Sequence, residues 1–488
     1  MTSVQDGLGR GSGVFRRKPI GAAPAEGEGG LKRTLGLWQL TAIGVGGIIG
    51  AGIFSLAGSV AHGDSEHGIA GVGPAVLISF LIAGIASAAA AFSYAEFAGL
   101  IPTAGSAYTY GYAVLGEIVG WFIGWDLLLE YTAIVAVVAI GISGYFGFLL
   151  DQIGLHLPAW MLGAPGTGSG HKVDLFAAIL CLLIAGLLNL GIKSAARFET
   201  IVVGLKVLVV LVVILVGFFY VKTGNYTPFA PSGFGGAMTG AATVFFAVFG
   251  YDAMSTAAEE SKDAQRHMPK AIIYSLAISM VLYVLACLVL TGMQSFTDIN
   301  PKSGFSSAFA SVGLNGLASV IAVGAIIGIL TVMFTFMLGV TRVWYSMSRD
   351  GLLPKWFAKT HPVRNVPTRV TWIAGVASAV IAGVLPIGKA AELTNIGILL
   401  AFVVVCVAVI VLRYQKPDLP RTFKVPGMPV VPLIGVGFSI WLITYLSPDT
   451  WIRFAVWFVI GVVIYFAYSR RNSLLATPSG EVSPPAGS

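Results

Sequence analysis

Four charged residues lie within stretches of the sequence that are otherwise apolar: Asp126, Glu130, Lys206 and Asp252. Asp126 and Glu130 are four positions apart in GWDLLLEY, so on a helix they share one face, where like charges repel each other. At least one of them should therefore be protonated or paired. Lys206, in TIVVGLKVLV, would cost about 2.5–3.5 kcal/mol inside a membrane helix, which makes it a candidate functional residue. The chemistry that these residues suit is the uptake and release of a proton.

Each of these residues also has a structural interpretation. Lys206 is only two turns from the start of its apolar stretch, so its side chain could extend to the membrane interface. Asp126 and Glu130 could join helices through hydrogen bonds. Asp252 could cap backbone donors where its helix is interrupted, and this remains an alternative to a direct role.

The composition shows which solvent surrounds these charges. The chain has 488 residues, of which 56% are hydrophobic and 10% charged, whereas soluble domains carry about 25% charged residues. Its mean hydropathy is +0.86. These values predict an all-α protein with many membrane-spanning helices. Three cysteines within apolar runs and six histidines in connections predict neither a disulfide framework nor a metal site.

A window of about 19 residues finds twelve apolar segments. They cover residues 37–61, 74–100, 115–150, 173–192, 200–222, 235–258, 270–293, 314–345, 369–387, 392–412, 429–447 and 450–469. With the N-terminus inside, 23 Lys and Arg residues fall on the inner side, five fall outside, and Lys206 lies within a segment. Inner connections are enriched in Lys and Arg, so we expect a cytoplasmic-membrane protein with both termini cytoplasmic. The basic net charge of +7 thus reports topology rather than nucleic-acid binding. Glu96 and Glu117, near segment ends, are expected at the membrane interface.

Two of the twelve segments carry signs of an interrupted helix. Segment 37–61 has five glycines between positions 44 and 52, each costing a helix roughly 1 kcal/mol relative to alanine. Close helix packing is the alternative explanation. Segment 235–258 places Gly250 and Asp252 deep in an apolar run. Interrupted segments at corresponding positions of two halves indicate an inverted-repeat transporter. Free N–H groups at such a break suit a carboxylate, and free C=O groups suit an ammonium.

Several motifs together resemble the amino acid, polyamine and organocation superfamily, and within it the bacterial relatives of the cationic amino acid transporters. They are GVGGIIGAGIF (44–54), AEFAGLIPTAGSAYTY (95–110), GWDLLLEY (124–131), ATVFFAVFGYDAMSTAAEE (242–260), YSMSRDGLLP (345–354) and PRTFKVPGMPVVPL (420–433). The resemblance covers about residues 31–470. It implies the five-plus-five inverted repeat of the leucine-transporter type with two extra C-terminal helices. The repeats would span about 37–222 and 235–412, and the extra helices 429–469. The transporter domain is then 37–470, between disordered cytoplasmic tails at 1–36 and 471–488.

The resemblance also implies roles for individual residues. The backbone of the first interrupted helix would hold the substrate carboxylate, at Ile49, Gly50, Ala51 and Gly52. Phe246 would close over the substrate, with Phe249 as a neighbouring wall and Phe336 on segment 314–345 as another. Glu130 matches the acid of segment 115–150, and Lys206 matches a lysine that in proton-coupled members stands where related transporters bind sodium. Two departures from the family pattern are Ala51, where many members have Thr or Ser, and Ile398, where Thr is usual.

Together these features predict a secondary active transporter of L-amino acids, with a proton as coupling ion and alternating access around a midplane site. No cofactor, nucleic acid or obligate protein partner is expected, and the lipid bilayer is the surrounding medium. The absence of a nucleophile elbow or phosphate loop argues against an enzyme. An amino acid exchanger and a polyamine transporter are close alternatives, and an amino-acid-gated channel or a transceptor is an alternative of a different class.

Overall fold

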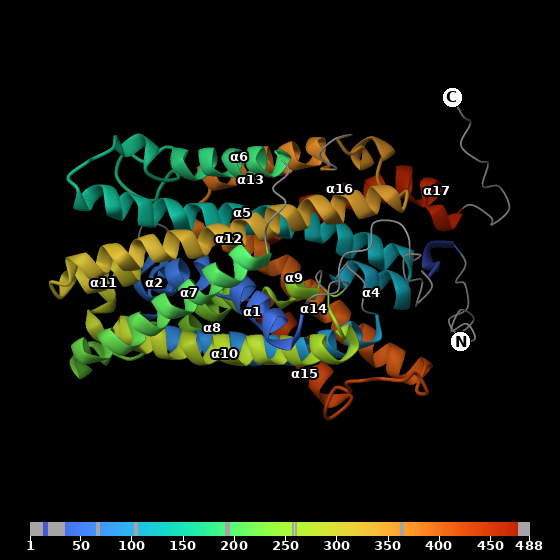
Figure 1. Ribbon diagram of the computed structural model, residues 1–488, viewed down its shortest axis with the longest axis horizontal. Coiled ribbons are helices and arrows are strands. Elements are labelled where there is room, and N and C mark those ends of the chain that lie inside the picture. Colours follow the sequence, from blue (N-terminus) through green and yellow to red (C-terminus); the bar gives the residue numbers. More distant parts are fainter. Residues whose placement is uncertain are drawn as a thin grey trace.

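The computed structural model describes residues 13–17, 35–64, 69–101, 106–190, 196–255, 258, 261–361 and 366–476. The other residues of the two predicted tails, 1–12, 18–34 and 477–488, lie outside the described residues. Most helices run along the long axis of the molecule (Figure 1). A hairpin of two short strands, β1 (Gly63–Asp64) and β2 (Ile69–Ala70), accompanies them.

Eight helices of the described residues are long and apolar enough to cross a membrane. They cover Leu37–His62, Gly73–Leu100, Glu117–Gln152, Ile201–Tyr220, Ala264–Met293, Asn315–Arg349, Ile387–Gln415 and Pro448–Asn472. Four shorter apolar helices cover Leu175–Asn189, Gly233–Val248, Thr368–Val384 and Val430–Ile443. The chain is therefore a multi-pass helical membrane protein, as the composition predicts, and each helix follows one of the twelve apolar segments.

The helices used below have the following bounds. They are α1 (Leu37–Ile48), α2 (Ala57–His62), α3 (Val76–Leu100), α4 (Ser106–Val114), α5 (Glu117–Gln152), α6 (Leu175–Asn189), α7 (Ala196–Gly217), α8 (Gly233–Val244), α9 (Tyr251–Ser255), α10 (Ala264–Met293), α11 (Gly304–Ser311), α12 (Asn315–Arg349), α13 (Thr368–Val384), α14 (Ile387–Gln415), α15 (Val430–Ile443), α16 (Pro448–Ile464) and α17 (Arg470–Asn472). Extensive contacts join α3 to α10, α5 to α12 and α6 to α13.

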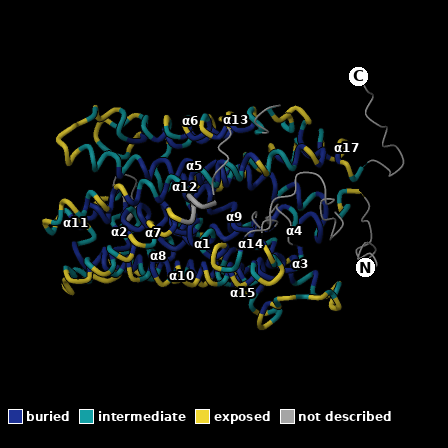
Figure 2. Tube along the Cα trace, viewed as in Figure 1, coloured by how far each residue is buried: buried dark blue, intermediate teal, exposed yellow. Residues whose placement is uncertain are grey.

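Burial separates a central bundle from peripheral helices. In helix 37–62, 83% of the most apolar 18-residue stretch is buried, whereas in helix 448–472 the corresponding share is 22%. Figure 2 shows the buried residues concentrated around α1, α5, α9 and α12. The C-terminal helix is therefore peripheral, and the first helix lies at the centre of the bundle.

Two glutamates near helix ends are more buried than the sequence suggests. Glu96 is 1% exposed and Glu117 is fully buried. Glu96 accepts hydrogen bonds from Arg413 and Arg421, and Glu117 accepts one from Ser473. Both carboxylates thus face protein partners, because connections from distant parts of the chain fold over them.

Candidate functional site

The first interrupted helix breaks at Ile49 and Gly50, which we call the first break. Helix α1 ends at Ile48, and Ile49 has an extended backbone with φ −72° and ψ 103°. The chain becomes helical again at Ala51, and residues Gly52–Leu56 form a π-helical turn before α2. The glycine-rich pattern thus correctly predicts a break.

The second break lies at Phe249 and Gly250. Helix α8 tightens into a 3-10 turn at Phe245–Val248, and Phe249 is extended with φ −106° and ψ 164°. Gly250 has φ +128°, a conformation that residues with a β-carbon rarely adopt. Helix α9 then begins at Tyr251 and carries Asp252 in its first turn.

The two breaks pack backbone against backbone. A β-carbon added to Gly47 would lie 2.8 Å from the carbonyl oxygen of Gly250, and one added to Gly52 would lie 2.3 Å from the β-carbon of Ala247. Neither distance is sterically possible without movement. Close packing and helix interruption are therefore both reasons for the glycines, and the contact brings the turn that carries Phe246 against the first interrupted helix.

Side chains from three other helices donate hydrogen bonds to backbone carbonyl groups of the first interrupted helix. Lys206 Nζ of α7 donates to the Gly46 carbonyl at 2.9 Å, and the Tyr283 hydroxyl of α10 donates to the Ile48 carbonyl at 2.7 Å. The Tyr145 hydroxyl of α5 donates to the Phe54 carbonyl. A cation at a helix C-terminus also meets the negative end of the helix dipole, so Lys206 stabilises the end of α1.

The second interrupted helix is supported in the same way. Asn395 of α14 donates from Nδ2 to the carbonyls of Ala242 and Thr243, at 2.7 and 2.9 Å. Ser87 of α3 donates to the Val248 carbonyl at 2.9 Å. Sequence reasoning missed Asn395, Ser87 and Tyr283 as site residues. Each of the three is a polar residue within an apolar run. That pattern marks the residue but does not identify its hydrogen-bond partner.

The amides of the first break lie where a helix begins. Backbone N–H groups at the start of a helix lack intrahelical acceptors, and the helix that resumes at Ala51 starts here. Among the described residues, the amides of Gly50, Ala51 and Gly52 take part in none of the backbone hydrogen bonds outside regular helices. Gly50 also faces α12 closely, since a β-carbon there would lie 3.1 Å from Val332 Cγ2. The first break therefore places backbone amide donors at the start of the resumed helix.

The structure places the predicted proton-coupling residues in two different environments. Lys206 is 1% exposed and reaches α1, so its side chain does not extend to the interface. Glu130 is fully buried, and its charged neighbours are Asp126 and Asp252. Neither Glu130 carboxylate oxygen has a hydrogen-bond partner within the described residues. Asp126 points towards α14, where a β-carbon on Gly397 would lie 2.7 Å from Asp126 Oδ1.

Two of the predicted aromatic walls, Phe336 and Phe249, lie in different surroundings. The Tyr131 hydroxyl donates to Asp252 Oδ2 at 2.5 Å, and Phe336 packs edge-on against the Tyr131 ring with centroids 5.2 Å apart. Phe249 instead belongs to an aromatic cluster with Phe402 of α14. Phe336 is thus close to the acids, whereas Phe249 forms part of the second break and packs against α14.

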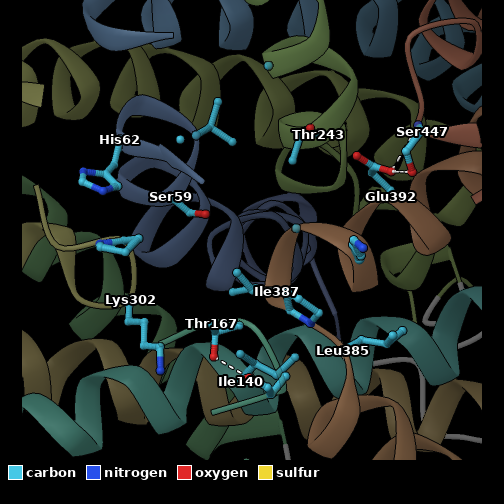
Figure 3. A pocket seen from close by; sticks show the side chains of 18 of the residues that line it. Ser59, His62, Ile140, Thr167, Thr243, Lys302, Leu385, Ile387, Glu392 and Ser447 are labelled. Atoms are coloured by element: carbon cyan, nitrogen blue, oxygen red, sulfur yellow. Dashed lines mark hydrogen bonds between the residues drawn. The ribbon is translucent and has the colours of Figure 1, made fainter. Parts of the chain in front are cut away.

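A cavity of about 410 Å³ is lined by residues of α2, α8 and the start of α14 and by the connection before α11. Helices α2 and α11 lie near one end of the bundle (Figure 1). We call this cavity the end cavity. Its lining includes Thr243, six residues before Phe249, and four charged residues: Asp174, Lys302, Lys389 and Glu392. Figure 3 shows Glu392 and Lys302 on opposite sides of it.

Burial shifts two of the charged groups at the cavity wall. It raises the pKa of the Asp174 carboxyl, and the hydrogen bonds from Ser143 and Ala177 together with the nearby Lys302 oppose part of this rise. It lowers the pKa of the Lys302 amino group, which Asp174 partly restores. Lys302 Nζ also donates to the Leu162 carbonyl at 2.9 Å. The cavity wall therefore holds the Lys302 amino group in a partly desolvated position.

The comparisons with known proteins give the family of this bundle of apolar helices with two facing breaks. A family model described as amino acid permease matches residues 35–471. The chain belongs to the amino acid permease family, which confirms the resemblance derived from the motifs.

Curated relatives carry transporter names. The chain is 45% identical over 465 residues to the methylthioribose transporter of Bacillus subtilis, and 46% identical over 467 residues to the branched-chain amino acid permease BcaP of the same organism. Each alignment covers 95% of this chain and 99% of the relative. Human cationic amino acid transporter 4 is 34% identical over 404 residues, which are 81% of this chain and 62% of the relative.

Proposed function

We propose that this permease is a secondary active transporter of L-amino acids that binds the substrate carboxylate at the first break. The observation that carries the proposal is the helix start at Gly50, Ala51 and Gly52, whose amides make no backbone hydrogen bond outside regular helices among the described residues. It lies beside carbonyls that accept hydrogen bonds from Lys206 and Tyr283. Donors converging at a helix start suit an anion. The amino acid permeases among the relatives support the same substrate class.

The proposed architecture has twelve membrane crossings in two inverted repeats of five, at about 37–222 and 235–412, followed by two extra helices at 429–469. Support comes from the pairing of α3 with α10, α5 with α12 and α6 with α13, each of which joins a helix of one half to its counterpart in the other. With the excess of Lys and Arg inside, the end that carries α17 is cytoplasmic, and the end cavity faces outward.

A proton is the proposed coupling ion, and no cofactor takes part. An ionised Glu130 would lack the hydrogen bonds that a buried charge requires. This favours proton binding when the site is closed to water. Lys206 links the same cycle to the first break because its ammonium holds the Gly46 carbonyl. Exchange of amino acids without net proton movement and transport of polyamines are the alternatives.

Transport of a sugar thioether is a second candidate function, favoured by the 45% identity to a methylthioribose transporter. Methylthioribose has no carboxylate and no ammonium, so it would bind through hydroxyl groups. Backbone amides can donate to hydroxyl oxygens too, but hydrogen bonds to an anion are roughly twice as strong as neutral ones. The carboxylate test therefore separates the two functions.

Uptake into proteoliposomes tests the proposal. We expect wild-type protein to carry leucine or arginine but neither leucinamide nor argininamide. Gly50→Val should eliminate uptake, because a β-carbon on Gly50 would already lie 3.1 Å from Val332 Cγ2 and a valine there would displace the first break. Phe246→Ala should alter the ranking of substrates. Gly204→Val is the matched control, since a β-carbon there meets nothing within 4 Å. Uptake of amides, polyamines or methylthioribose in place of amino acids would reject carboxylate recognition.

A further inference from the structure

The end cavity holds a carboxylate whose two oxygens have different surroundings. Glu392 is 7% exposed, and its Oε2 accepts hydrogen bonds from the Ser447 amide, the Ser447 hydroxyl and the Thr450 hydroxyl, at 3.2, 2.5 and 2.9 Å. All hydrogen bonds that the described residues make to this carboxylate end on Oε2. Figure 3 shows the other oxygen turned away from Ser447, on the side of Thr243. Glu392 is thus fixed by one oxygen and presents the other to the cavity.

A carboxylate oxygen held in this way needs a donor from the ligand or from water. Leaving a buried charged acceptor unpaired costs roughly 1–3 kcal/mol or more. Each of the two lysines in the lining has a protein partner other than Glu392. Lys389 Nζ lies 3.8 Å from the Asp449 carboxylate. Lys302, on the side of the cavity opposite Glu392, donates a hydrogen bond to the Leu162 carbonyl.

The shape and charge of the end cavity suit a small zwitterion. Its volume of about 410 Å³ lies within the range of small-molecule sites, about 300–1,000 Å³. Glu392 supplies an acceptor at one side and Lys302 a positive group at the other. Apolar side chains such as Ile140 and Ile387 line the space between them.

We propose that the end cavity is a second solute site, separate from the breaks, in which Glu392 Oε1 accepts hydrogen bonds from the ammonium group of an amino acid. The carboxylate of the same solute points towards Lys302. The inference rests on the proposed amino acid transport, because a solute reaching the breaks from this end passes Thr243 at the cavity floor.

The probe is isopentylamine, which is leucine without its carboxylate. It can occupy an ammonium site, but it lacks the group that the first break is proposed to bind. Calorimetric titration of the full-length protein in nanodiscs should detect it in the wild type. Glu392→Gln should weaken binding at least tenfold, because the side-chain amide oxygen still accepts from Ser447 and Thr450 but the negative charge is gone.

The matched control is Asp449→Asn, which removes an exposed carboxylate beside Lys389 of the cavity lining. This variant should leave the affinity within twofold. Ser59→Phe provides a second route, because it fills the end cavity without touching Glu392 and should also abolish binding. Equal binding by wild type and Glu392→Gln, loss of binding in Asp449→Asn, or undiminished binding in Ser59→Phe would each overturn the inference.

Gly50→Val distinguishes this site from the breaks. We expect this variant to lose leucine uptake and to bind isopentylamine as the wild type does. If it loses both, the chain has one solute site and the inference is wrong, while the proposed function stands. If it retains leucine uptake, the carboxylate site is wrongly placed, and the amine titrations still decide whether Glu392 binds an ammonium.

Discussion

Gly47 and Gly250 face each other with no room for a side chain between them. A β-carbon on Gly47 would lie 2.8 Å from the Gly250 carbonyl oxygen, and one on Gly250 would lie 2.6 Å from the Gly47 carbonyl. The two residues are far apart in the sequence and belong to different interrupted helices. Their contact sets how closely the two breaks approach, and so the space left for a solute beside them.

Gly47→Ala should destabilise the protein by about 1–3 kcal/mol, the usual cost of overpacking a core, and should slow transport more than it lowers protein yield. Thermal unfolding of the purified protein measures the first effect and proteoliposome uptake the second. Gly204→Ala adds the same methyl group to α7 where nothing lies within 4 Å, and should change neither. An unaltered unfolding temperature in Gly47→Ala would show that the breaks are not packed as described.

Asn395 should act as a donor and not through its shape. Asn395→Asp keeps the size but cannot donate to the Ala242 and Thr243 carbonyls, so it should reduce stability at least as much as Asn395→Ala, by about 1–3 kcal/mol for unsatisfied buried groups. Chemical or thermal unfolding compares the two variants. Wild-type stability in Asn395→Asp would mean that these hydrogen bonds do not support the second break.

Lys206→Ala should abolish uptake driven by a pH gradient, because it removes the ammonium that joins α7 to the Gly46 carbonyl. The measurement is substrate accumulation in proteoliposomes with an imposed gradient. Lys222→Ala changes an exposed lysine two positions beyond the end of the same helical segment, Ile201–Tyr220, and should accumulate substrate normally. A Lys206→Ala protein with the wild-type pH dependence would assign Lys206 a structural role and leave Glu130 as the candidate proton carrier.

Glu130→Gln should uncouple uptake from the pH gradient while leaving exchange of internal for external substrate intact. The amide cannot gain or lose a proton, yet it retains the size of the acid. Counterflow and gradient-driven uptake, measured on one preparation, separate the two activities. Equal loss of both would place Glu130 in substrate binding or in folding.

The proposed orientation can be tested with single cysteines in an otherwise cysteine-free chain. Cysteines at Ser12, Asp263 and Ser479 should resist an impermeant thiol reagent in intact cells and react once the membrane is opened. A cysteine at Lys222 should react from outside. Labelling of any of the first three positions in intact cells would contradict the charge-based topology.

The sequence by itself determined that this is a multi-pass helical membrane protein with an interrupted first helix. Hydropathy and glycine content act locally: a run of about 20 apolar residues is long enough to cross a bilayer, and five glycines within nine positions weaken a helix wherever it packs. Gly250 within its apolar run likewise marked the second break. The motif pattern was specific enough to indicate the amino acid permease family.

Only the tertiary structure decided which groups meet. Lys206 and the Gly46 carbonyl are 160 positions apart, and Asn395 and the Ala242 carbonyl are 153 apart. Such hydrogen bonds depend on how whole helices pack, so no local pattern encodes them. The same packing left Glu392 with one oxygen bonded and the other in the end cavity, because the connection that carries Ser447 folds over the start of α14.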